Sequence, residues 1–287
     1  MTTRRHEFQA IGTNWTITSS PGLTTVSLAR LQRTVEEFDL AYSRFRPDSD
    51  VSRFARTGGS HEFPDSAAVL LAFYRELYDI TGGRVSPLVG RALEHLGYDA
   101  DYSLERRPGQ VSVPRWEDVL TVQGSLLTAG EPVLLDLGAA GKGYLVDLLA
   151  GELTESGYDE YLIDASGDIA HVGPMLCRVG LEHPGAAGQV IGVANLCNAS
   201  LCGSAVNRRT WGAGLHHVID PATGEPTTEV LATWVVADRT MVADGLATAL
   251  FFTEPSVLAR HFEFTYVRML ATGGVEYSKN FDGELFT

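Results

Sequence analysis

The chain contains no run of about 20 uninterrupted apolar residues, the length that a transmembrane helix requires. No apolar segment follows Arg4 and Arg5 either, where a secretory signal peptide would have one. We therefore expect a cytoplasmic protein with no membrane partner.

Basic residues are scarce relative to acidic ones. The chain has 36 Asp and Glu against 22 Lys and Arg, a formal net charge of −14 at pH 7. Because an acidic surface repels polyanions, we expect no nucleic-acid partner. A phosphate-rich ligand would require the few cations to gather in one place, or a metal ion to be recruited.

Cysteine is also scarce. The three residues, Cys177, Cys197 and Cys202, are odd in number and lack C-x-x-C spacing, which argues against a disulfide framework and structural zinc. We expect buried free thiols instead. His216 and His217 are adjacent, so they do not form the i,i+4 pair of a helical zinc site.

The remaining composition, 44% hydrophobic and 20% charged, is typical of a globular protein. The β-forming residues of 8–19 predict a hairpin around Gly12-Thr13, and apolar residues at three- and four-residue steps predict helices at 27–45 and 65–80. The charged stretch 98–110 predicts a surface excursion. Further strands are expected at 132–137, 161–164, 189–196, 231–237 and 265–271, and further helices at 143–153 and 242–252. This succession predicts an α+β fold of mixed sheets with packed helices.

A small-residue stretch, Asp136–Tyr144, lies between a predicted strand and a predicted helix. Small residues allow close approach to a ligand, N–H groups at a helix start favour phosphate oxygens, and Lys142 adds a cation. The stretch matches neither the P-loop spacing nor G-x-G-x-x-G. A tight structural turn accounts for it equally well.

A second stretch, Met241–Leu250, predicts a helix with Asp244 and Thr248 one turn apart on one face. A carboxylate and a hydroxyl are hard oxygen donors that suit Mg²⁺. The alternative is a carboxylate near a helix start, which is favourable without a metal.

Two shorter stretches combine turns with polar side chains. His217 precedes the turn Asp220–Gly224, where it could orient a leaving phosphate or act as an acid or base near neutral pH, although a plain hairpin is also expected there. The turn Asp164–Asp168 could bring backbone close to a ligand or only connect two strands.

Taken together and in this order, these stretches resemble the ApbE family of FAD:protein FMN transferases. Residues 136–147 resemble its D-L-G-x-x-x-K-G-Y-x-x-D element, 217–224 its H-x-I-D-P-x-T-G signature and 243–250 its A-D-A-L-A-T-A-L helix. Further matches are 11–13 to M-G-T, 42–54 to S-x-F-x-P-x-S-x-x-S-R-F, 81–90 to T-x-G-x-F-D-P-x-V-G, and 161–169 to a strand ending in G-G-D. The resemblance covers about residues 8–278. It implies a T-fold-like architecture and one domain over 1–287, which can comprise two closely packed lobes with the FAD site between them.

The resemblance implies a reaction in which Mg²⁺ assists transfer of FMN from FAD to a Ser or Thr hydroxyl of a target protein, with AMP leaving. The implied Mg²⁺ ligands are the Ala139 carbonyl, Asp244 and Thr248. The implied FAD contacts are Ile11, Phe45, Arg84, Val85, Ser86, Asp136, Lys142 and Ile219. The implied catalytic residues are Lys142, which with the metal stabilises charge on the pyrophosphate, and His217 and Asp244, either of which could activate the hydroxyl.

The chain departs from the family pattern mainly at the ring-binding end. Val85 and Ser86 replace its Phe-Asp pair, Ile11 replaces Met, Gly141 replaces Ala and Ser166 replaces Gly. None of these positions is an implied metal ligand, so we expect the metal and phosphate end to be kept.

Two other functions fit the same residues. The first is an Mg²⁺-dependent FAD pyrophosphatase, in which water attacks and FMN and AMP are both released. The second is a non-catalytic flavin-binding or flavin-delivery protein, which the altered turn at Ser86 favours and the Asp244/Thr248 pair opposes.

Overall fold

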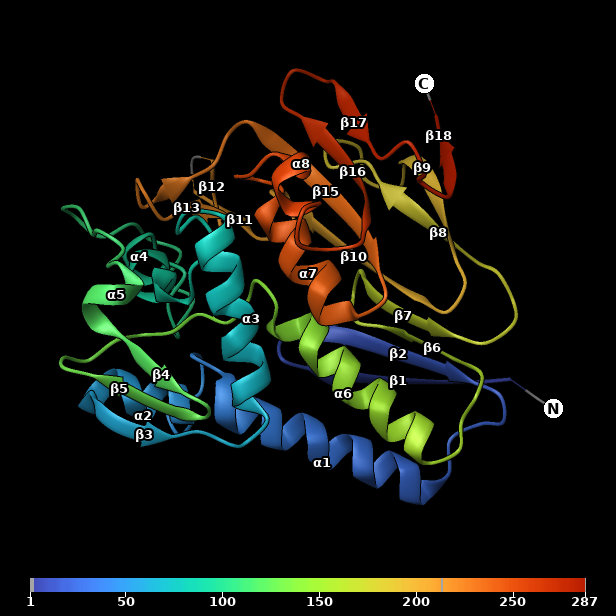
Figure 1. Ribbon diagram of the computed structural model, residues 1–287, viewed down its shortest axis with the longest axis horizontal. Coiled ribbons are helices and arrows are strands. Elements are labelled where there is room, and N and C mark those ends of the chain that lie inside the picture. Colours follow the sequence, from blue (N-terminus) through green and yellow to red (C-terminus); the bar gives the residue numbers. More distant parts are fainter. Residues whose placement is uncertain (1–2, 213, 287) are drawn as a thin grey trace.

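The computed structural model describes residues 3–212 and 214–286, and it is built around an eight-stranded antiparallel sheet (Figure 1). The strand order is β1-β2-β6-β7-β10-β15-β16-β17. The strands are β1 (Arg4–Ala10), β2 (Thr13–Ser19), β6 (Tyr161–Asp164), β7 (Asp168–Val172), β10 (Ala199–Ala205), β15 (Val230–Ala237), β16 (Thr265–Leu270) and β17 (Val275–Tyr277). The predicted α+β fold is confirmed.

Helices cover one face of this sheet, with α6 and α7 against it and α1 packed on α6 (Figure 1). The helices are α1 (Thr25–Tyr42), α2 (Asp50–Thr57), α3 (Ala67–Ile80), the short 3₁₀ helix η1 (Pro87–Val89), α4 (Gly90–His95), α5 (Trp116–Val119), α6 (Gly141–Glu155), α7 (Thr240–Ala249) and α8 (Pro255–Leu258). The start of α1 is capped by Thr24, whose side chain accepts from the Ser27 amide.

Four smaller sheets complete the fold. One consists of β8 (Cys177–Glu182), β9 (Val190–Leu196) and β18 (Gly283–Leu285), and another of β3 (Gly59–Glu62), β4 (Thr121–Gln123) and β5 (Leu126–Ala129). The two-stranded sheets are β11 (Thr210–Trp211) with β12 (Leu215–His216), and β13 (Ile219–Asp220) with β14 (Glu225–Pro226).

Alternation along the central strands separates two cores. On β10, Cys202 belongs to the core under the helices, whereas Leu201 belongs to a second core shared with Leu181 and Leu196 of β8 and β9. Successive side chains of a strand point to opposite faces, so one apolar strand serves both layers. The β8–β9–β18 sheet therefore covers the face that the helices leave free.

The predicted hairpin over 8–19 is confirmed, but its turn is at Ile11-Gly12 and not at Gly12-Thr13. Ala10 pairs with Thr13, and both intervening residues have positive φ, 42° at Ile11 and 76° at Gly12. A two-residue turn with positive φ at both positions matches the twist of an antiparallel pair.

The strand predicted over 132–137 is absent. The segment is buried, with Leu135 fully inaccessible, but it has no ladder partner and packs against the start of α4. A side chain at Gly90 would lie 2.6 Å from the Leu134 carbonyl oxygen, so the segment contacts helix backbone directly. A run of apolar residues indicates that a segment is buried, but not whether the segment forms a strand.

Three other expectations need correction. The predicted helix over 242–252 begins at Thr240 and ends at Ala249, and the strand predicted over 265–271 ends at Leu270. Of the three thiols only Cys202 is buried; Cys177 is half-buried and Cys197 is exposed, because they lie on or beside the outer β8–β9 sheet.

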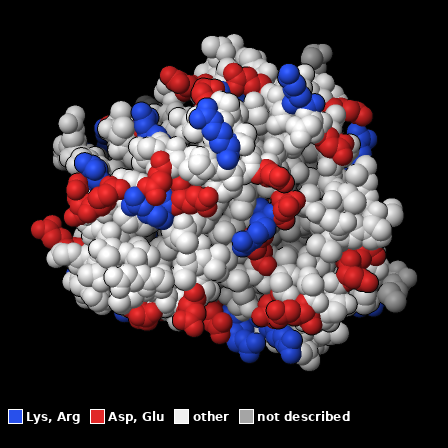
Figure 2. Space-filling model, in the orientation of Figure 1, with Lys and Arg blue, Asp and Glu red and all other residues white. Residues whose placement is uncertain are grey.

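Within the described residues, no helix combines the length and the apolar character needed to cross a bilayer. Acidic and basic side chains are interspersed over the face shown in Figure 2.

Candidate active site

One cavity of about 810 Å³ contains every residue to which the sequence assigned a site role. These residues are Ile11, Phe45, Arg84, Val85, Ser86, Asp136, Ala139, Lys142, His217, Ile219, Asp244 and Thr248. The volume is within the range of sites for small molecules and cofactors. Motifs far apart in the sequence therefore form one site.

Three residues with oxygen donors, Ala139, Asp244 and Thr248, line the cavity where α7 passes the segment before α6. The Thr248 hydroxyl lies 3.4 Å from the Ala139 carbonyl oxygen, to which it donates. Asp244 is one turn earlier on the same face of α7, and only 4% of the residue is exposed. Its Oδ2 accepts from the Gly143 amide at 2.9 Å.

Close contact between α6 and α7 makes this arrangement possible. A Cβ atom at Gly143 would lie 2.4 Å from the Thr240 carbonyl oxygen, so only glycine fits there. Asp147, one turn further along α6, accepts from the Thr240 amide at 2.7 Å and the Met241 amide at 3.1 Å. It thereby caps α7 from a neighbouring helix.

Lys142 lies between two buried carboxylates. Its Nζ is 2.5 Å from Asp168 Oδ2 and 3.1 Å from the Ala165 carbonyl oxygen. Burial alone would lower the pKa of Lys142, but the carboxylates of Asp168 and Asp244 reverse this, so its net pKa is raised and it stays charged. Burial and the neighbouring Asp168 raise the pKa of Asp244 well above its usual range.

The backbone amides before α6 are not free to bind phosphate, contrary to the expectation from sequence. The N–H groups of residues 138–140 donate to protein acceptors, one to Asp136 Oδ1 at 2.9 Å and two to the Tyr74 hydroxyl at 3.0 and 3.1 Å. The amide of Gly143 donates to Asp244. Recognition of phosphate at this segment therefore depends on Lys142.

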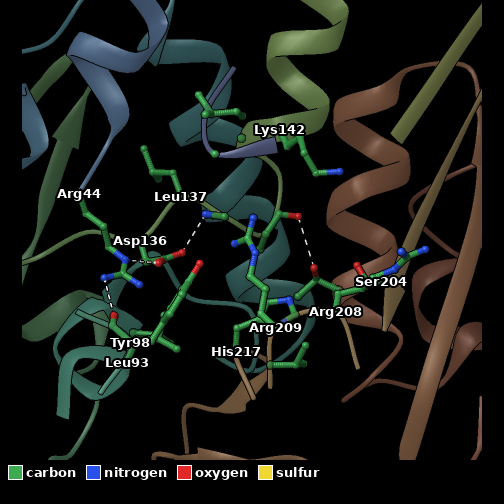
Figure 3. A pocket seen from close by; sticks show the side chains of 18 of the residues that line it. Arg44, Leu93, Tyr98, Asp136, Leu137, Lys142, Ser204, Arg208, Arg209 and His217 are labelled. Atoms are coloured by element: carbon green, nitrogen blue, oxygen red, sulfur yellow. Dashed lines mark hydrogen bonds and ion pairs between the residues drawn. The ribbon is translucent and has the colours of Figure 1, made fainter. Parts of the chain in front are cut away.

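Arg44 and Asp136 form a buried ion pair that lines the cavity, to the left of Lys142 in Figure 3. Arg44 Nε is 2.5 Å from Asp136 Oδ2, and Nη1 donates to the Tyr98 carbonyl oxygen at 2.8 Å. Burial alone would raise the pKa of Asp136, but the Arg44 guanidinium, the Gly138 amide and Arg209 together more than offset this, and the net pKa is lowered. Asp136 is therefore a carboxylate, held in place by a side chain that is only 3% exposed.

Aromatic rings form the wall beside this ion pair. The Arg44 guanidinium lies 4.1 Å from the centre of the Phe45 ring, and Phe45 is stacked on Tyr102 with a centroid distance of 5.2 Å. Tyr98 is stacked on Trp211 at 5.5 Å. Flat aromatic and guanidinium surfaces are suited to stacking against a planar ring system.

The turn containing Val85 and Ser86, which departs from the family pattern, is capped by the serine. The Ser86 hydroxyl accepts from the Leu88 amide at 3.2 Å and caps η1, a position that Asp also favours. Arg84 pairs with Asp220, which joins this turn to the β13–β14 hairpin. The hairpin expected after His217 is confirmed.

His217 lies beside Arg209 in the cavity (Figure 3). Burial, with the charges of Arg209 and His216, lowers the pKa of His217 to about 3. The ring is therefore neutral near pH 7, where it can accept a hydrogen bond, but a pKa of about 3 makes it a weak proton acceptor. His217 therefore does not act as an acid near neutral pH, one of the two roles expected from sequence.

Several cavity residues were not predicted from sequence. Tyr98, Arg209 and Trp211 lie outside every stretch that resembles the family, and Arg44 occupies a variable position of the 42–54 match. Asp168 had a usable signal, because it occupies the aspartate position of the turn that resembles G-G-D.

The α+β fold and this cavity, which combines hard oxygen donors with aromatic rings, fit an enzyme that binds a cofactor. The sequence model of the ApbE family matches residues 11–267, and the chain belongs to that family. It is 28% identical over 243 residues to a FAD:protein FMN transferase of Vibrio cholerae, covering 77% of this chain and 71% of the relative. It is 26% identical over 244 residues to one of Haemophilus influenzae, covering 77% and 70%.

Solved structures support the same fold. The ApbE protein of Thermotoga maritima superposes with a TM-score of 0.87 at 21% identity, covering 97% of both chains. The flavin transferase ApbE of Vibrio cholerae superposes with a TM-score of 0.78 at 23% identity, covering 96% of this chain and 97% of its own.

Proposed function

We propose that this protein is an Mg²⁺-dependent FAD:protein FMN transferase, which moves FMN from FAD to a Ser or Thr hydroxyl of a target protein and releases AMP. The observation that carries the proposal is the contact between the Thr248 hydroxyl and the Ala139 carbonyl, with Asp244 one turn away on α7, in one cavity with aromatic walls. The relatives named for this activity support it. The expected cytoplasmic location belongs to the same proposal.

The residues present fit a magnesium ion. Asp244 and Asp168 place two carboxylates beside the single ammonium of Lys142, which favours binding of a further cation. Within residues 3–212 and 214–286, no group of three or more His, Cys, Asp or Glu side chains could hold a metal by itself. A site with one carboxylate, one hydroxyl and one carbonyl suits Mg²⁺, which keeps waters and shares substrate phosphates.

The chemistry is a displacement at phosphorus. The target hydroxyl oxygen forms a bond to the FMN-side phosphorus, the bond from that phosphorus to the oxygen bridging to AMP breaks, and AMP leaves with the bridging oxygen. Bound Mg²⁺ would offset negative charge on the pyrophosphate. Lys142 would add a fixed positive charge beside it. Asp244, and less readily neutral His217, would accept the hydroxyl proton.

Mass spectrometry of a Ser/Thr-containing target protein incubated with FAD and Mg²⁺ tests the proposal. We expect a mass increase corresponding to one attached FMN, and no increase in EDTA or with Asp244→Asn. Asp50→Asn is a matched control, because Asp50 is a largely buried carboxylate that pairs with Arg53 and His61 and does not line the cavity. Labelling that persists in EDTA would refute the metal dependence, and AMP release without labelling would favour the pyrophosphatase.

A further inference from the structure

Tyr74 is a buried side chain directly behind the proposed cation site. It lies on α3 and is fully inaccessible to solvent. Its hydroxyl oxygen accepts from the Ala139 amide at 3.0 Å and the Ala140 amide at 3.1 Å. Neither the motifs nor the resemblance assigned it a role.

Its position follows from how α3 meets α7. A Cβ atom at Gly245 would lie 2.5 Å from the Phe73 ring, so α3 packs directly on the backbone of α7 next to Asp244. The same helix therefore contacts the helix that carries Asp244 and the segment that carries Ala139. Tyr74 is the residue of α3 that holds the segment carrying Ala139.

The geometry of one peptide unit gives Tyr74 a consequence for the site. The Ala139 carbonyl and the Ala140 amide belong to the same peptide group, and in a trans peptide they point in opposite directions. Because the Tyr74 hydroxyl holds the Ala140 N–H, the Ala139 oxygen must point away from Tyr74. On that side Thr248 Oγ1 lies 3.4 Å from it.

We infer that Tyr74 is a positioning residue for the cation site: its hydroxyl fixes the Ala139–Ala140 peptide so that the Ala139 carbonyl oxygen faces Asp244 and Thr248. A hydrogen bond to the N–H of a peptide also polarises its carbonyl, which makes the oxygen a better cation ligand. This inference rests on the proposed magnesium site and goes beyond it by naming the residue that orients one ligand.

Tyr74→Phe removes only the hydroxyl. Partners that orient metal ligands typically contribute about 10- to 100-fold to affinity, so we expect Mg²⁺ binding weaker by about that factor. The Kd is measured by isothermal titration calorimetry without FAD or target. We also expect labelling activity to recover at saturating Mg²⁺, which a general loss of structure would not allow.

Tyr161→Phe is the matched control. Tyr161 is also a buried tyrosine with two hydrogen bonds, to Ala150 and Thr154, but it does not line the cavity. Its substitution should leave the Kd for Mg²⁺ unchanged. Equal Kd values in wild type and Tyr74→Phe would overturn the inference while leaving the proposed function intact. A wild-type protein that binds no Mg²⁺ would overturn both.

A spectroscopic measurement reports on the peptide itself. The chain has adjacent alanines at 67–68, 139–140 and 186–187, so labelling alanine with ¹³C at the carbonyl and with ¹⁵N gives three linked NMR signals. Replacing Ala68 or Ala187 with serine assigns two of them. We expect the 139–140 signal to shift on adding Mg²⁺, and to shift in Tyr74→Phe before any Mg²⁺ is added. An unchanged signal in that variant would overturn the inference.

If Tyr74→Phe does not fold, 4-aminophenylalanine at position 74 takes its place. It keeps the shape and polarity of tyrosine, but its amino group is a poor hydrogen-bond acceptor. The expected loss of Mg²⁺ affinity and the contradicting result are the same as for Tyr74→Phe.

Discussion

Asp244 is held as a buried acid whose charge depends on what binds beside it. Burial and the neighbouring Asp168 raise the pKa of Asp244, and Lys142 reverses only part of this increase. The ionised carboxylate therefore lowers the free energy of unfolding of the metal-free protein, and a bound cation would reverse this effect. The pH dependence of stability should therefore reveal the role of Asp244.

The pH dependence of Asp244→Asn tests this at the residue scale. Since the folded pKa of Asp244 is raised, the folded state binds more protons than the unfolded state between about pH 3.9 and the folded pKa, and stability falls as pH rises through that window. Asparagine does not ionise, so Asp244→Asn removes this fall in stability. Without Mg²⁺ we expect the variant to have the higher Tm at pH 7, with the difference vanishing below about pH 4.

Thermal unfolding in EDTA across this pH range measures the effect. Excess Mg²⁺ should stabilise the wild type and not the variant, because only the wild type keeps the charged ligand. A metal-free wild type that is more stable than Asp244→Asn at pH 7 would contradict the assignment.

Among the elements, the β1–β2 turn carries a residue that its backbone conformation disfavours but that lines the cavity. Ile11 has a φ of 42°, which β-branched residues rarely adopt, and it lines the cavity. Asparagine followed by glycine is the preferred sequence for such a turn. We interpret the isoleucine as retained for its contact with the ligand.

Ile11→Asn should therefore stabilise the protein and weaken flavin binding. Relief of the strained φ is expected to add about 1 kcal/mol, raising Tm by about 2–4 °C. Thermal unfolding and a flavin-fluorescence titration measure the two effects. A variant with lower Tm, or with undiminished FAD affinity, would contradict the interpretation that a strained Ile11 is retained for its contact with FAD.

Elements with strong local signals were predictable from sequence. The hairpin at the N-terminus, the α1 and α3 helices and the strands at β6, β9, β15 and β16 follow apolar periodicity and turn residues. The extended segment at 132–137 was not, because its apolar side chains are buried in the core under the helices and not by pairing with a neighbouring strand. Local pattern reports which residues are buried but not which element covers them.

At the scale of the whole molecule, the order of the motifs predicted a common site, and one cavity contains all of their assigned residues. What could not be predicted is the support behind them. Arg44 pairs with Asp136, 92 residues away, and Tyr74 holds an amide 66 residues away. Such contacts exist only after folding, so a single sequence carries no pattern for them.

In the proposed transfer, attachment of FMN to the target protein and release of AMP occur in the same turnover. Counting released AMP and protein-bound FMN in one reaction with FAD, Mg²⁺ and a target protein tests this coupling. We expect one AMP for each FMN attached, and neither product in EDTA. AMP released at the same rate with or without the target, and with no FMN attached, would contradict it.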